Sequence, residues 1–363
     1  MSRRLAAALL VPMFCCFPAI AERPKAQSPL RERIDALLVK QFPSDAPGAA
    51  VLVVRDGKLI LEKGYGTADL GRKTPVTSES NFDLASMSKP FTALAVMILA
   101  DRGKLGFDDD VRKYLPELAA PPGPRPVRIR DLLQHTSGIP EYSAGWQRLL
   151  VNLSKLTNDR VVQILKDRKP DFLPGAEFKY CNSNYVLLAE IVRRVGGRRF
   201  GEFMRDEVFR PLGMDRTVAM DDLSIKISDR AIGYMKAGRE WEPATQDSPV
   251  CGDGNVFSNL RDLAKWDTAM AAEKLVRPAT WRLAWTASKL DDGKETGYGF
   301  GWVIEKRVGK RFVWHNGRWG GIRTMIGRWP DDQLTIMLLC NDDGAEAEKL
   351  VAQIAEIVFD MTR

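Results

Sequence analysis

Histidine and closely spaced cysteine are what this chain most lacks. Its 363 residues include only two histidines, His135 and His315, and five cysteines. A zinc site held by three histidines is therefore excluded, and no Cys-x-x-Cys spacing is present to close a tetrahedral site. A site built from carboxylates alone stays open on these counts. We predict that the protein works without a metal or another cofactor.

Charge of a single sign is also missing. The 54 Lys and Arg residues stand against 47 Asp and Glu, a formal charge of +7, and the two signs are interleaved along the chain. Nucleic-acid-binding domains gather their basic residues on one face or stripe, so we predict no nucleic-acid partner. A hydrophobic content of 45% with 28% charged residues is typical of a globular protein with a large core.

Long hydrophobic runs are absent except at the start of the chain. Two arginines precede an apolar stretch, residues 5–17, and the small residues Ala19-Ile20-Ala21 follow it. This order is typical of a secretory signal peptide, which we predict over residues 1–21 with cleavage after Ala21. We expect a secreted or periplasmic protein with no stable membrane span after cleavage. The alternative is a retained anchor, but the stretch is shorter than the roughly 20 residues that a helical span needs.

Signal cleavage would leave three cysteines, Cys181, Cys251 and Cys340. An odd number in an exported protein leaves at least one free thiol, so this chain is not a disulfide framework. The redox state of each thiol stays open.

Both ends of the mature chain carry the pattern of a sheet covered by helices. Apolar runs at 48–54 and 59–65 flank Asp56-Gly57, a pair that favours a tight hairpin turn. Helical spacing of apolar residues opens the mature chain at 30–42 and closes it at 350–361. Strand patterns separated by turn residues return near the end, at 297–306, 310–314, 322–329 and 334–340.

The middle of the chain reads mostly as short helices and loops. The simplest assembly is an α/β (α+β) fold, in which residues 22–107 and 287–363 form one antiparallel sheet with flanking helices. Residues 108–286 are then an inserted, mostly helical domain. Residues 91–100 are apolar on nearly every side, which predicts a helix buried in the core. We expect a ligand site where the two parts join.

Ser86 and Lys89 directly precede that buried helix. A helix start favours developing negative charge, and a lysine three residues on can face the serine hydroxyl. A serine becomes a strong nucleophile only when a base removes its proton, and a desolvated lysine can act as that base. The competing interpretation is a helix cap with an ordinary surface lysine.

Tyr180 and Asn182 form a second candidate, in a loop before an apolar helix. A phenol near a lysine can relay protons to a leaving group, and the Asn amide can bind a substrate carbonyl and the lysine. The alternative is a loop tyrosine with a capping Asn.

A third candidate, His315-Asn316-Gly317, follows a strand pattern. The glycine would let substrate lie close to the strand, and the backbone N–H groups of Arg318 and Ser86 could form an oxyanion hole. The alternative is a hairpin turn with a solvated histidine.

Together, Ser-x-x-Lys, Tyr-x-Asn and His-x-Gly in this order make the chain recognisable. It resembles the penicillin-recognising serine hydrolases, in particular class C β-lactamases and their esterase, D-aminopeptidase and D-Ala-D-Ala carboxypeptidase relatives. The resemblance covers nearly the whole mature chain. The segments that carry it are 82–93, 132–140 with its His-Thr-Ser-Gly loop, 252–258, 262–266 and 298–302.

The resemblance implies a mechanism through an acyl-enzyme. Ser86 would attack an ester, amide or lactam carbonyl, with Lys89 and Tyr180 managing its proton. His315 would line the site and assist binding or proton transfer, and Asn182, Asn316 and Gly317 would hold substrate. His135 lies in a loop that the resemblance makes structural, although a Ser-His-Asp triad through it stays an alternative.

One departure from the family pattern bears on the substrate. True β-lactamases of this group usually carry lysine where this chain has His315, and histidine is mostly neutral at pH 7. We therefore expect carboxylesterase or D-amino-acid peptidase activity on a small ester, amide or D-amino-acid peptide. Arg318 and Arg323 could restore a cation, which keeps a β-lactamase or D-Ala-D-Ala carboxypeptidase as the alternative. An inactive protein that binds cell-wall peptides is the alternative outside enzymes.

Overall fold

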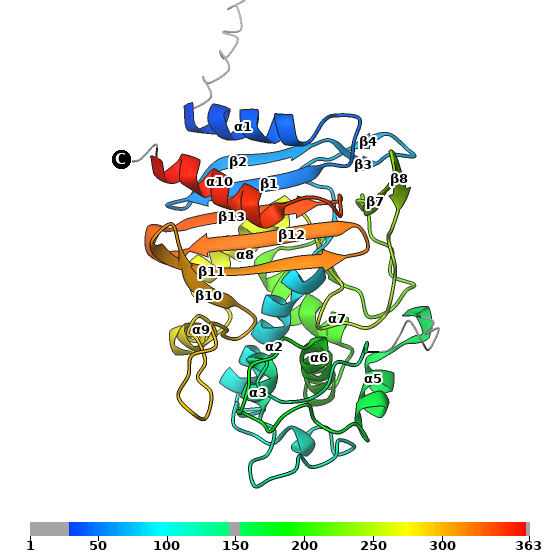
Figure 1. Ribbon diagram of the computed structural model, residues 1–363, viewed down its shortest axis with the longest axis vertical. Helices are drawn as coiled ribbons and strands as arrows, with labels where there is room; N and C mark the ends of the chain where they lie inside the picture. Colours follow the sequence, from blue (N-terminus) through cyan, green and yellow to red (C-terminus); the bar gives the residue numbers. More distant parts are fainter. Residues whose placement is uncertain (1–28, 145–152, 361–363) are drawn as a thin grey trace, which may run out of the picture.

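The computed structural model describes residues 29–144 and 153–360, and one six-stranded antiparallel sheet organises them. The strand order is β10-β11-β12-β13-β1-β2 (Figure 1). The strands are β1 (Ala49–Arg55), β2 (Lys58–Tyr65), β10 (Val303–Arg307), β11 (Lys310–Trp319), β12 (Ile322–Trp329) and β13 (Leu334–Cys340). Because β1 pairs with β13, the sheet is built from both ends of the chain, and the predicted fold class is confirmed.

Two terminal helices, α1 (Pro29–Gln41) and α10 (Ala347–Asp360), cover one face of this sheet, which we call the outer face (Figure 1). Ile34 and Leu38 of α1 and Val351 and Ile354 of α10 are fully buried in the cluster that these helices share with the sheet. Their spacing of three and four residues places them on one side of each helix, as the sequence pattern predicts.

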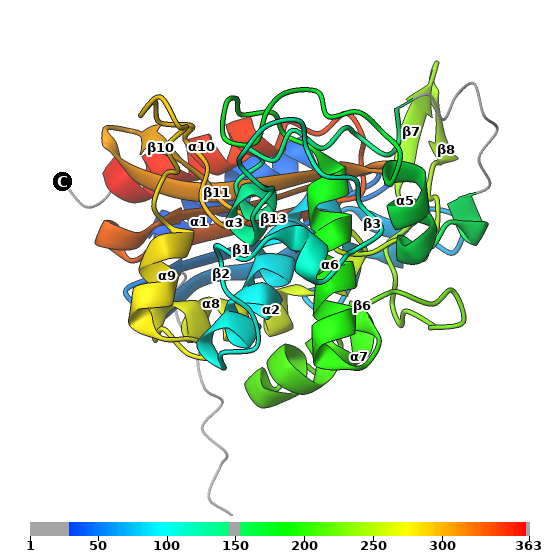
Figure 2. The same ribbon diagram turned by 90° about the horizontal axis from the view of Figure 1, so that it is seen from below.

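The helical part of the chain packs against the opposite, inner face (Figure 2). At its centre lies α2 (Lys89–Asp101), which is buried from its first residue to Leu99. The predicted core helix is therefore present and begins two residues earlier than residue 91. The ring of Phe91 stacks on Trp266 with 3.9 Å between centroids. The other helices of this part are α3 (Ile129–Leu133), α5 (Asn158–Leu165), α6 (Asn182–Gly196), α7 (Phe200–Met204), α8 (Leu260–Ala271) and α9 (Pro278–Ala284).

Short strands also occur in the region expected to be mostly helical. A three-stranded sheet pairs β5 (Phe82–Asp83) with β9 (Val256–Ser258) and β9 with β6 (Val218–Ala219). Strands of two or three residues are too short to show an alternating pattern, so the sequence did not reveal them. The remaining short elements are β3 (Thr67–Asp69), β4 (Thr74–Pro75), β7 (Tyr234–Ala237), β8 (Glu240–Pro243) and the turns η1 (Ala85–Ser88), η2 (Val111–Lys113), η3 (Leu153–Lys155), η4 (Arg205–Phe209), η5 (Arg210–Leu212) and η6 (Pro330–Asp332).

Two boundaries differ from expectation in the last sheet strands. β11 runs on to Trp319, beyond the predicted end at 314, and β10 begins only at Val303. Gly297 and Gly301 have φ of 72° and 81°, which no extended strand can include, so residues 297–302 form a loop. The predicted division into a sheet domain and a helical domain at 107/108 and 286/287 stays a prediction.

The predicted signal peptide, residues 1–21, lies outside the described residues. Within 29–144 and 153–360, no helix is both long enough and apolar enough to cross a membrane. Cys181, Cys251 and Cys340 are each free and buried.

Candidate active site

A sharp turn between β5 and α2 holds Ser86. Leu84 follows the end of β5, and Ala85 takes a positive φ of 46°, which Asp83 supports by accepting a hydrogen bond from the Ala85 N–H at 2.8 Å. The hydroxyl of Thr324 on β12 donates to the Leu84 carbonyl at 2.7 Å and ties the turn to the sheet. Ser86 therefore sits immediately before α2, pressed against the inner face of the sheet.

Gly317 makes this close approach possible. A Cβ at Gly317 would lie 2.2 Å from the Leu84 carbonyl oxygen and 2.3 Å from Thr324 Oγ1, closer than any side chain allows. The sequence predicts that this glycine lets substrate lie along β11. The structure shows that the turn carrying Ser86 occupies the space a side chain at this position would fill, and the contact with substrate stays a prediction.

Lys89 connects three segments of the site through its ammonium group. Its Nζ lies 3.0 Å from Ser86 Oγ, 2.9 Å from Asn182 Oδ1 and 2.9 Å from the carbonyl oxygen of Asp253. The side chain is fully buried, and its three donors meet three acceptors. The structure thus brings together Ser86, Lys89 and Asn182, although Asn182 lies 93 positions after Lys89 in the chain.

Tyr180 lies over this lysine, in the extended segment before α6. The centre of its ring is 4.8 Å from Lys89 Nζ, and 42% of the residue is exposed. The ring of Tyr180 packs against two other rings, with 4.5 Å between its centroid and that of His135 and 6.3 Å to that of Tyr298. Tyr180 therefore joins the buried lysine to the open side of the site.

The His135 ring is held in place by hydrogen bonds. Its Nδ1 accepts hydrogen bonds from the Cys181 N–H and from the Asn184 amide, both at 3.2 Å. Burial lowers the pKa of His135 well below its usual value, so the ring is neutral. The structure gives its Nδ1 no carboxylate partner among the described residues, which removes the support for a Ser-His-Asp triad through His135.

His315 is buried and neutral as well. Its Nδ1 lies 2.6 Å from the Asn316 carbonyl oxygen, which can only accept, so Nδ1 carries the proton. Its Nε2 then accepts from the hydroxyl of Tyr298 at 3.0 Å. Burial, followed by the nearby charge of Lys89, lowers the pKa of His315 to about 3. This histidine brings no positive charge to the site, and Tyr298 is a partner that the sequence did not reveal.

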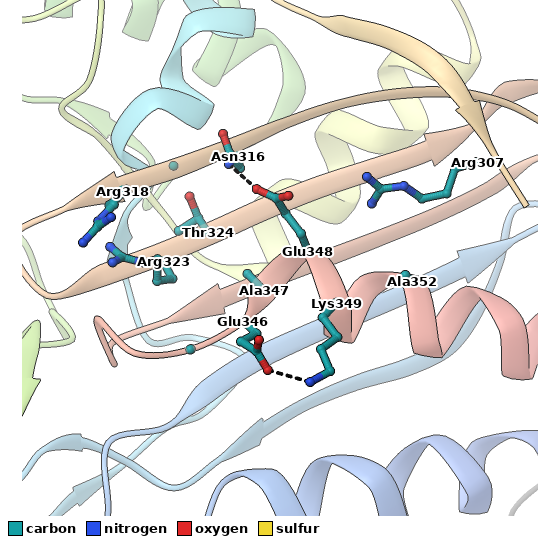
Figure 3. A pocket seen from close by; sticks show the side chains of 12 residues that line it. Arg307, Asn316, Arg318, Arg323, Thr324, Glu346, Ala347, Glu348, Lys349 and Ala352 are labelled. Carbon is teal, nitrogen blue, oxygen red and sulfur yellow. Dashed lines mark hydrogen bonds and ion pairs between the residues drawn. The ribbon is translucent and has the colours of Figure 1, made fainter.

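Asn316 and Arg318 point the other way, because side chains alternate along a strand. The Asn316 amide donates to Glu348 of α10 at 2.6 Å on the outer face (Figure 3). Arg323 and Arg318 both contact Asp343, at 2.7 Å and 3.5 Å (Figure 3 shows the two arginines on this face). The structure therefore does not bring the Asn316 side chain or either arginine charge to Ser86. Only the backbone of Asn316 remains for the predicted contact with substrate.

The backbone of Arg318 does face the site. Gly320 and Gly321 form a two-residue hairpin with positive φ, which closes with Trp319 opposite Ile322 as a hydrogen-bonded pair. The next pair, Arg318 with Arg323, is then a non-hydrogen-bonded one, and the Arg318 N–H points to the free edge of β11. β10 covers that edge only as far as Trp314. The geometry is compatible with the predicted oxyanion hole.

A pocket opens beside Ser86 on the side of β5 and β9. It is lined by Asp83, Ala85, Ser86, Tyr142, Ser143, Leu153, Asn182, Ser248, Val250, Asp253, Gly254, Asn255, Arg318 and Trp319. Asp253 and Tyr142 are new to the site, although both lie in or next to segments that carry the family resemblance. Among the described residues, no group of three or more His, Cys, Asp or Glu side chains is arranged to hold a metal ion.

Known proteins resemble this chain in both sequence and fold. A family model described as Beta-lactamase matches residues 36–359. Penicillin-binding protein 4* of Bacillus subtilis is 33% identical over 85% of this chain and 71% of its own length. A D-aminopeptidase of Brucella anthropi is 28% identical over 85% of this chain, which spans only 59% of that protein. An octameric penicillin-binding protein homologue from Pyrococcus abyssi superimposes with a TM-score of 0.81 and 26% identity, over 91% of this chain and 77% of its own.

Proposed function

Because this chain belongs to the Beta-lactamase family and is a serine hydrolase, we propose that Ser86 is its nucleophile and that it cleaves small amides and esters of D-amino acids. The observation that carries the proposal is the contact of 3.0 Å between Lys89 Nζ and Ser86 Oγ, inside a buried site. In its neutral amine form, a lysine at this distance accepts the hydroxyl proton as the oxygen attacks the substrate carbonyl, and it becomes the ammonium.

Other groups of the site stabilise the oxyanion and transfer the proton to the leaving group. The backbone N–H groups of Ser86 and Arg318 stabilise the oxyanion. The proton then passes from Lys89 through the Tyr180 hydroxyl to the leaving nitrogen or oxygen, whose bond to the carbonyl carbon breaks. Water attacks the acyl-enzyme, gives up a proton along the same route, and the acid leaves while Ser86 regains its hydrogen. Asn182 holds Lys89 in place and faces the pocket.

The choice of substrate class rests on the missing cation. A β-lactam antibiotic or a peptide ending in D-Ala carries a carboxylate that a fixed positive charge would recognise. Here His315 is neutral, and Arg318 and Arg323 are held by Asp343 on the outer face. This arrangement favours amidase, aminopeptidase or esterase activity over the carboxypeptidase and β-lactamase alternatives. The D-aminopeptidase relative supports the same choice.

The test compares the purified chain with its Ser86→Ala variant on three substrates: a p-nitrophenyl ester, D-alanine p-nitroanilide and a chromogenic cephalosporin. We expect turnover of the first two, slow or no turnover of the third, and a loss of about a thousandfold or more in kcat on substitution. Ester turnover that survives the substitution would contradict the assignment of Ser86. Cephalosporin cleavage faster than that of the anilide would reverse the substrate order. The absence of both turnover and acylation by a fluorophosphonate would favour a peptide-binding protein.

We also propose that the chain is exported and loses residues 1–21. The support is the order of arginines, apolar stretch and small residues at its start. A mature protein from the periplasm or medium that begins at Glu22 is the expected result, and an intact N-terminus on the cell membrane would show a retained anchor.

A further inference from the structure

The pocket beside Ser86 contains two carboxylates that no cation of the described residues contacts directly. Asp83, three residues before Ser86, is only 6% exposed, and Asp253 follows Gly252 in the loop that leads into β9. Both line the pocket together with Ser86. Neither forms a salt bridge within the parts of the chain that the structure describes, 29–144 and 153–360.

One oxygen of each carboxylate accepts a hydrogen bond from the protein. Asp83 Oδ1 accepts from the Ala85 N–H at 2.8 Å, and Asp253 Oδ2 accepts from the Tyr142 hydroxyl at 3.0 Å. A carboxylate has room for several more donors on its two oxygens. The side chains therefore keep acceptor capacity on the side that lines the pocket.

The nearby cations have other partners. Arg318, which also lines the pocket, contacts Asp343 at 3.5 Å. Lys89 directs its three donors to Ser86, Asn182 and the backbone of Asp253 rather than to either carboxylate. Arg230, the cation that acts on Asp83, is paired with Asp247 at 2.5 Å. Burial raises the pKa of Asp83 and of Asp253 to about 6, because desolvation outweighs the opposing charges of Arg230 on Asp83 and of Lys89 on Asp253, and both are largely ionised above that pH.

From this pocket, and resting on the proposed function, we propose that the enzyme recognises a free ammonium group on the acyl part of its substrate, through Asp83 and Asp253. An ammonium group supplies the positive charge and up to three N–H donors that these carboxylates lack. The substrates are then D-amino-acid amides, esters or peptides with an unblocked amino terminus.

The position of the pocket assigns the ammonium group to the acyl part. In the proposed reaction the leaving group must meet Tyr180, which protonates it. Tyr180 does not line this pocket, whereas Ser86, Ala85 and Gly254 do. The portion of the substrate that stays on Ser86 therefore occupies it. Trp319 and Val250 in the same lining provide apolar surface for the substrate side chain.

The experiment compares D-alanine p-nitroanilide with N-acetyl-D-alanine p-nitroanilide, which differ in the charge of the amine. We expect kcat/KM of the wild-type enzyme to favour the free amine by about tenfold or more, since a lost ion pair of about 1.4 kcal/mol has this effect. Asp83→Asn and Asp253→Asn each keep one acceptor for Ala85 or Tyr142 and remove the charge. Each should lower the ratio of the two kcat/KM values by about tenfold.

The matched control is Asp56→Asn, in the exposed β1–β2 turn, which makes the same chemical change far from the pocket and should leave the ratio unchanged. Equal use of both anilides by the wild-type enzyme would overturn the proposal without any variant. A ratio that neither pocket substitution changes would overturn the assignment to these two carboxylates. In both cases, turnover of a neutral p-nitrophenyl ester that depends on Ser86 would show that the proposed function itself still holds.

Discussion

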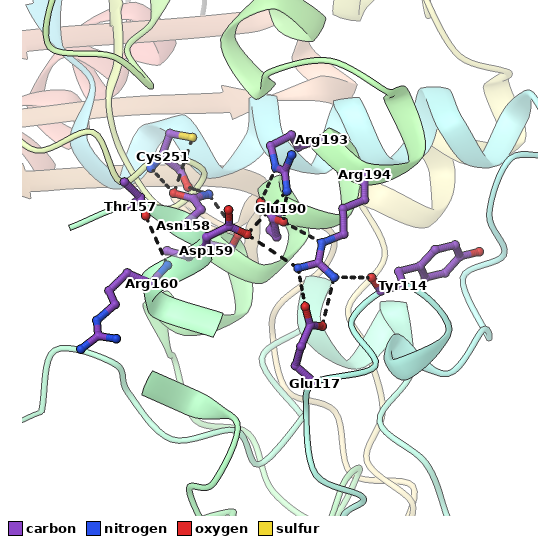
Figure 4. A network of polar contacts seen from close by, with 11 residues as sticks. Tyr114, Glu117, Thr157, Asn158, Asp159, Arg160, Glu190, Arg193, Arg194 and Cys251 are labelled. Atoms are coloured by element: carbon purple, nitrogen blue, oxygen red, sulfur yellow. Dashed lines mark hydrogen bonds and ion pairs between the residues drawn. The ribbon is translucent and has the colours of Figure 1, made fainter. Parts of the chain in front are cut away.

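Buried carboxylates occur in two regions of this molecule, and they are treated in opposite ways. Glu190 on α6 is 1% exposed and accepts three hydrogen bonds of 2.7–2.8 Å from Arg193 and Arg194 (Figure 4). Glu117 also forms a bidentate ion pair with Arg194, with N–O distances of 2.9 and 3.0 Å. Burial alone would raise the pKa of Glu190, but the hydrogen bonds from Arg193 and Arg194 outweigh burial and lower it.

The pocket beside Ser86 shows the reverse. Asp83 is buried and Asp253 is half-buried, neither forms a salt bridge among the described residues, and desolvation raises the pKa of both to about 6. A fold that needed these charges only for stability would pair them, as the network around Glu190 does. An unpaired buried charge lowers stability, and such groups are concentrated where a ligand supplies the missing partner. Under our proposal, the paired carboxylates stabilise the fold and the unpaired ones bind the substrate.

The largest expected effect comes from removing one cation in each region. Lys89→Met should lower kcat by about a thousandfold or more, because the proton of Ser86 then has no acceptor within reach. Arg194→Met removes the same charge from the network, and we expect it to leave kcat/KM within about twofold while lowering the melting temperature. Steady-state kinetics and thermal unfolding of both proteins measure these changes. Equal losses of activity in the two variants would erase the distinction between the regions.

An intermediate effect comes from neutralising one carboxylate in each region, with opposite signs. Glu190→Gln should lower the free energy of unfolding near pH 8 by about 2–4 kcal/mol, because it leaves two arginines without their buried partner. Asp83→Asn keeps an acceptor for the Ala85 N–H and removes an unpaired buried charge. It should therefore raise the free energy of unfolding near pH 8 by about 1–3 kcal/mol.

The pH dependence gives the sign of each effect independently. The pKa of Asp83 is raised from 3.8 to about 6. The loss in free energy of unfolding that its ionised form causes is therefore absent below about pH 4 and grows as the pH rises through 6. The hydrogen bond from the Ala85 N–H and the charge of Arg230 oppose the rise, and the charges of Asp247 and Asp253 add to it. The pKa of Glu190 is lowered, so its contribution is present above 4.5 and is lost as the pH falls. Urea unfolding at about pH 8 and pH 4 should show both differences shrinking at the lower pH. A stabilising effect of Asp83→Asn that persisted at pH 4 would contradict the role of its charge.

The smallest expected effect concerns a polar group on the outer face of the sheet. Asn316→Ala removes only a hydrogen bond to Glu348 on that face, and we expect kcat/KM to change by less than about twofold. Kinetics with D-alanine p-nitroanilide test this. A loss comparable to that of the pocket variants would show that residues outside the pocket also select the substrate.

The sequence predicts local features of the fold and site well. The Asp56-Gly57 pair forms the expected turn, with φ of 50° and 69°, and the three-residue spacing of Ser86 and Lys89 brings their side chains together. These features depend on neighbours in the chain. The orientation of Asn316 also had a sequence signal, since a strand that turns His315 and Gly317 inward must turn Asn316 outward.

The contacts that the sequence missed join distant segments. The Asp253 carbonyl meets Lys89 across 164 residues, and Tyr298 meets His315 through a loop whose course depends on glycines with positive φ. Asp83 and Asp253 share a pocket only because β5 pairs with β9. No periodicity within either segment encodes such a pairing, so the counter-charge that each carboxylate lacks became visible only in three dimensions.

Because the sheet is built from both ends of the chain, the enzyme can complete its fold only late. The Gly48 N–H donates to Asn341 Oδ1 at 2.7 Å across 293 positions, and Thr324 holds the turn of Ser86 across 240. Contacts of such long range form late, after the entropy of closing a very long loop has been lost. During synthesis, Ser86 and Lys89 leave the ribosome long before β11 and β12 exist to support them. Catalysis therefore begins only when nearly the last strand is in place, and recovery of activity after denaturation should report complete folding.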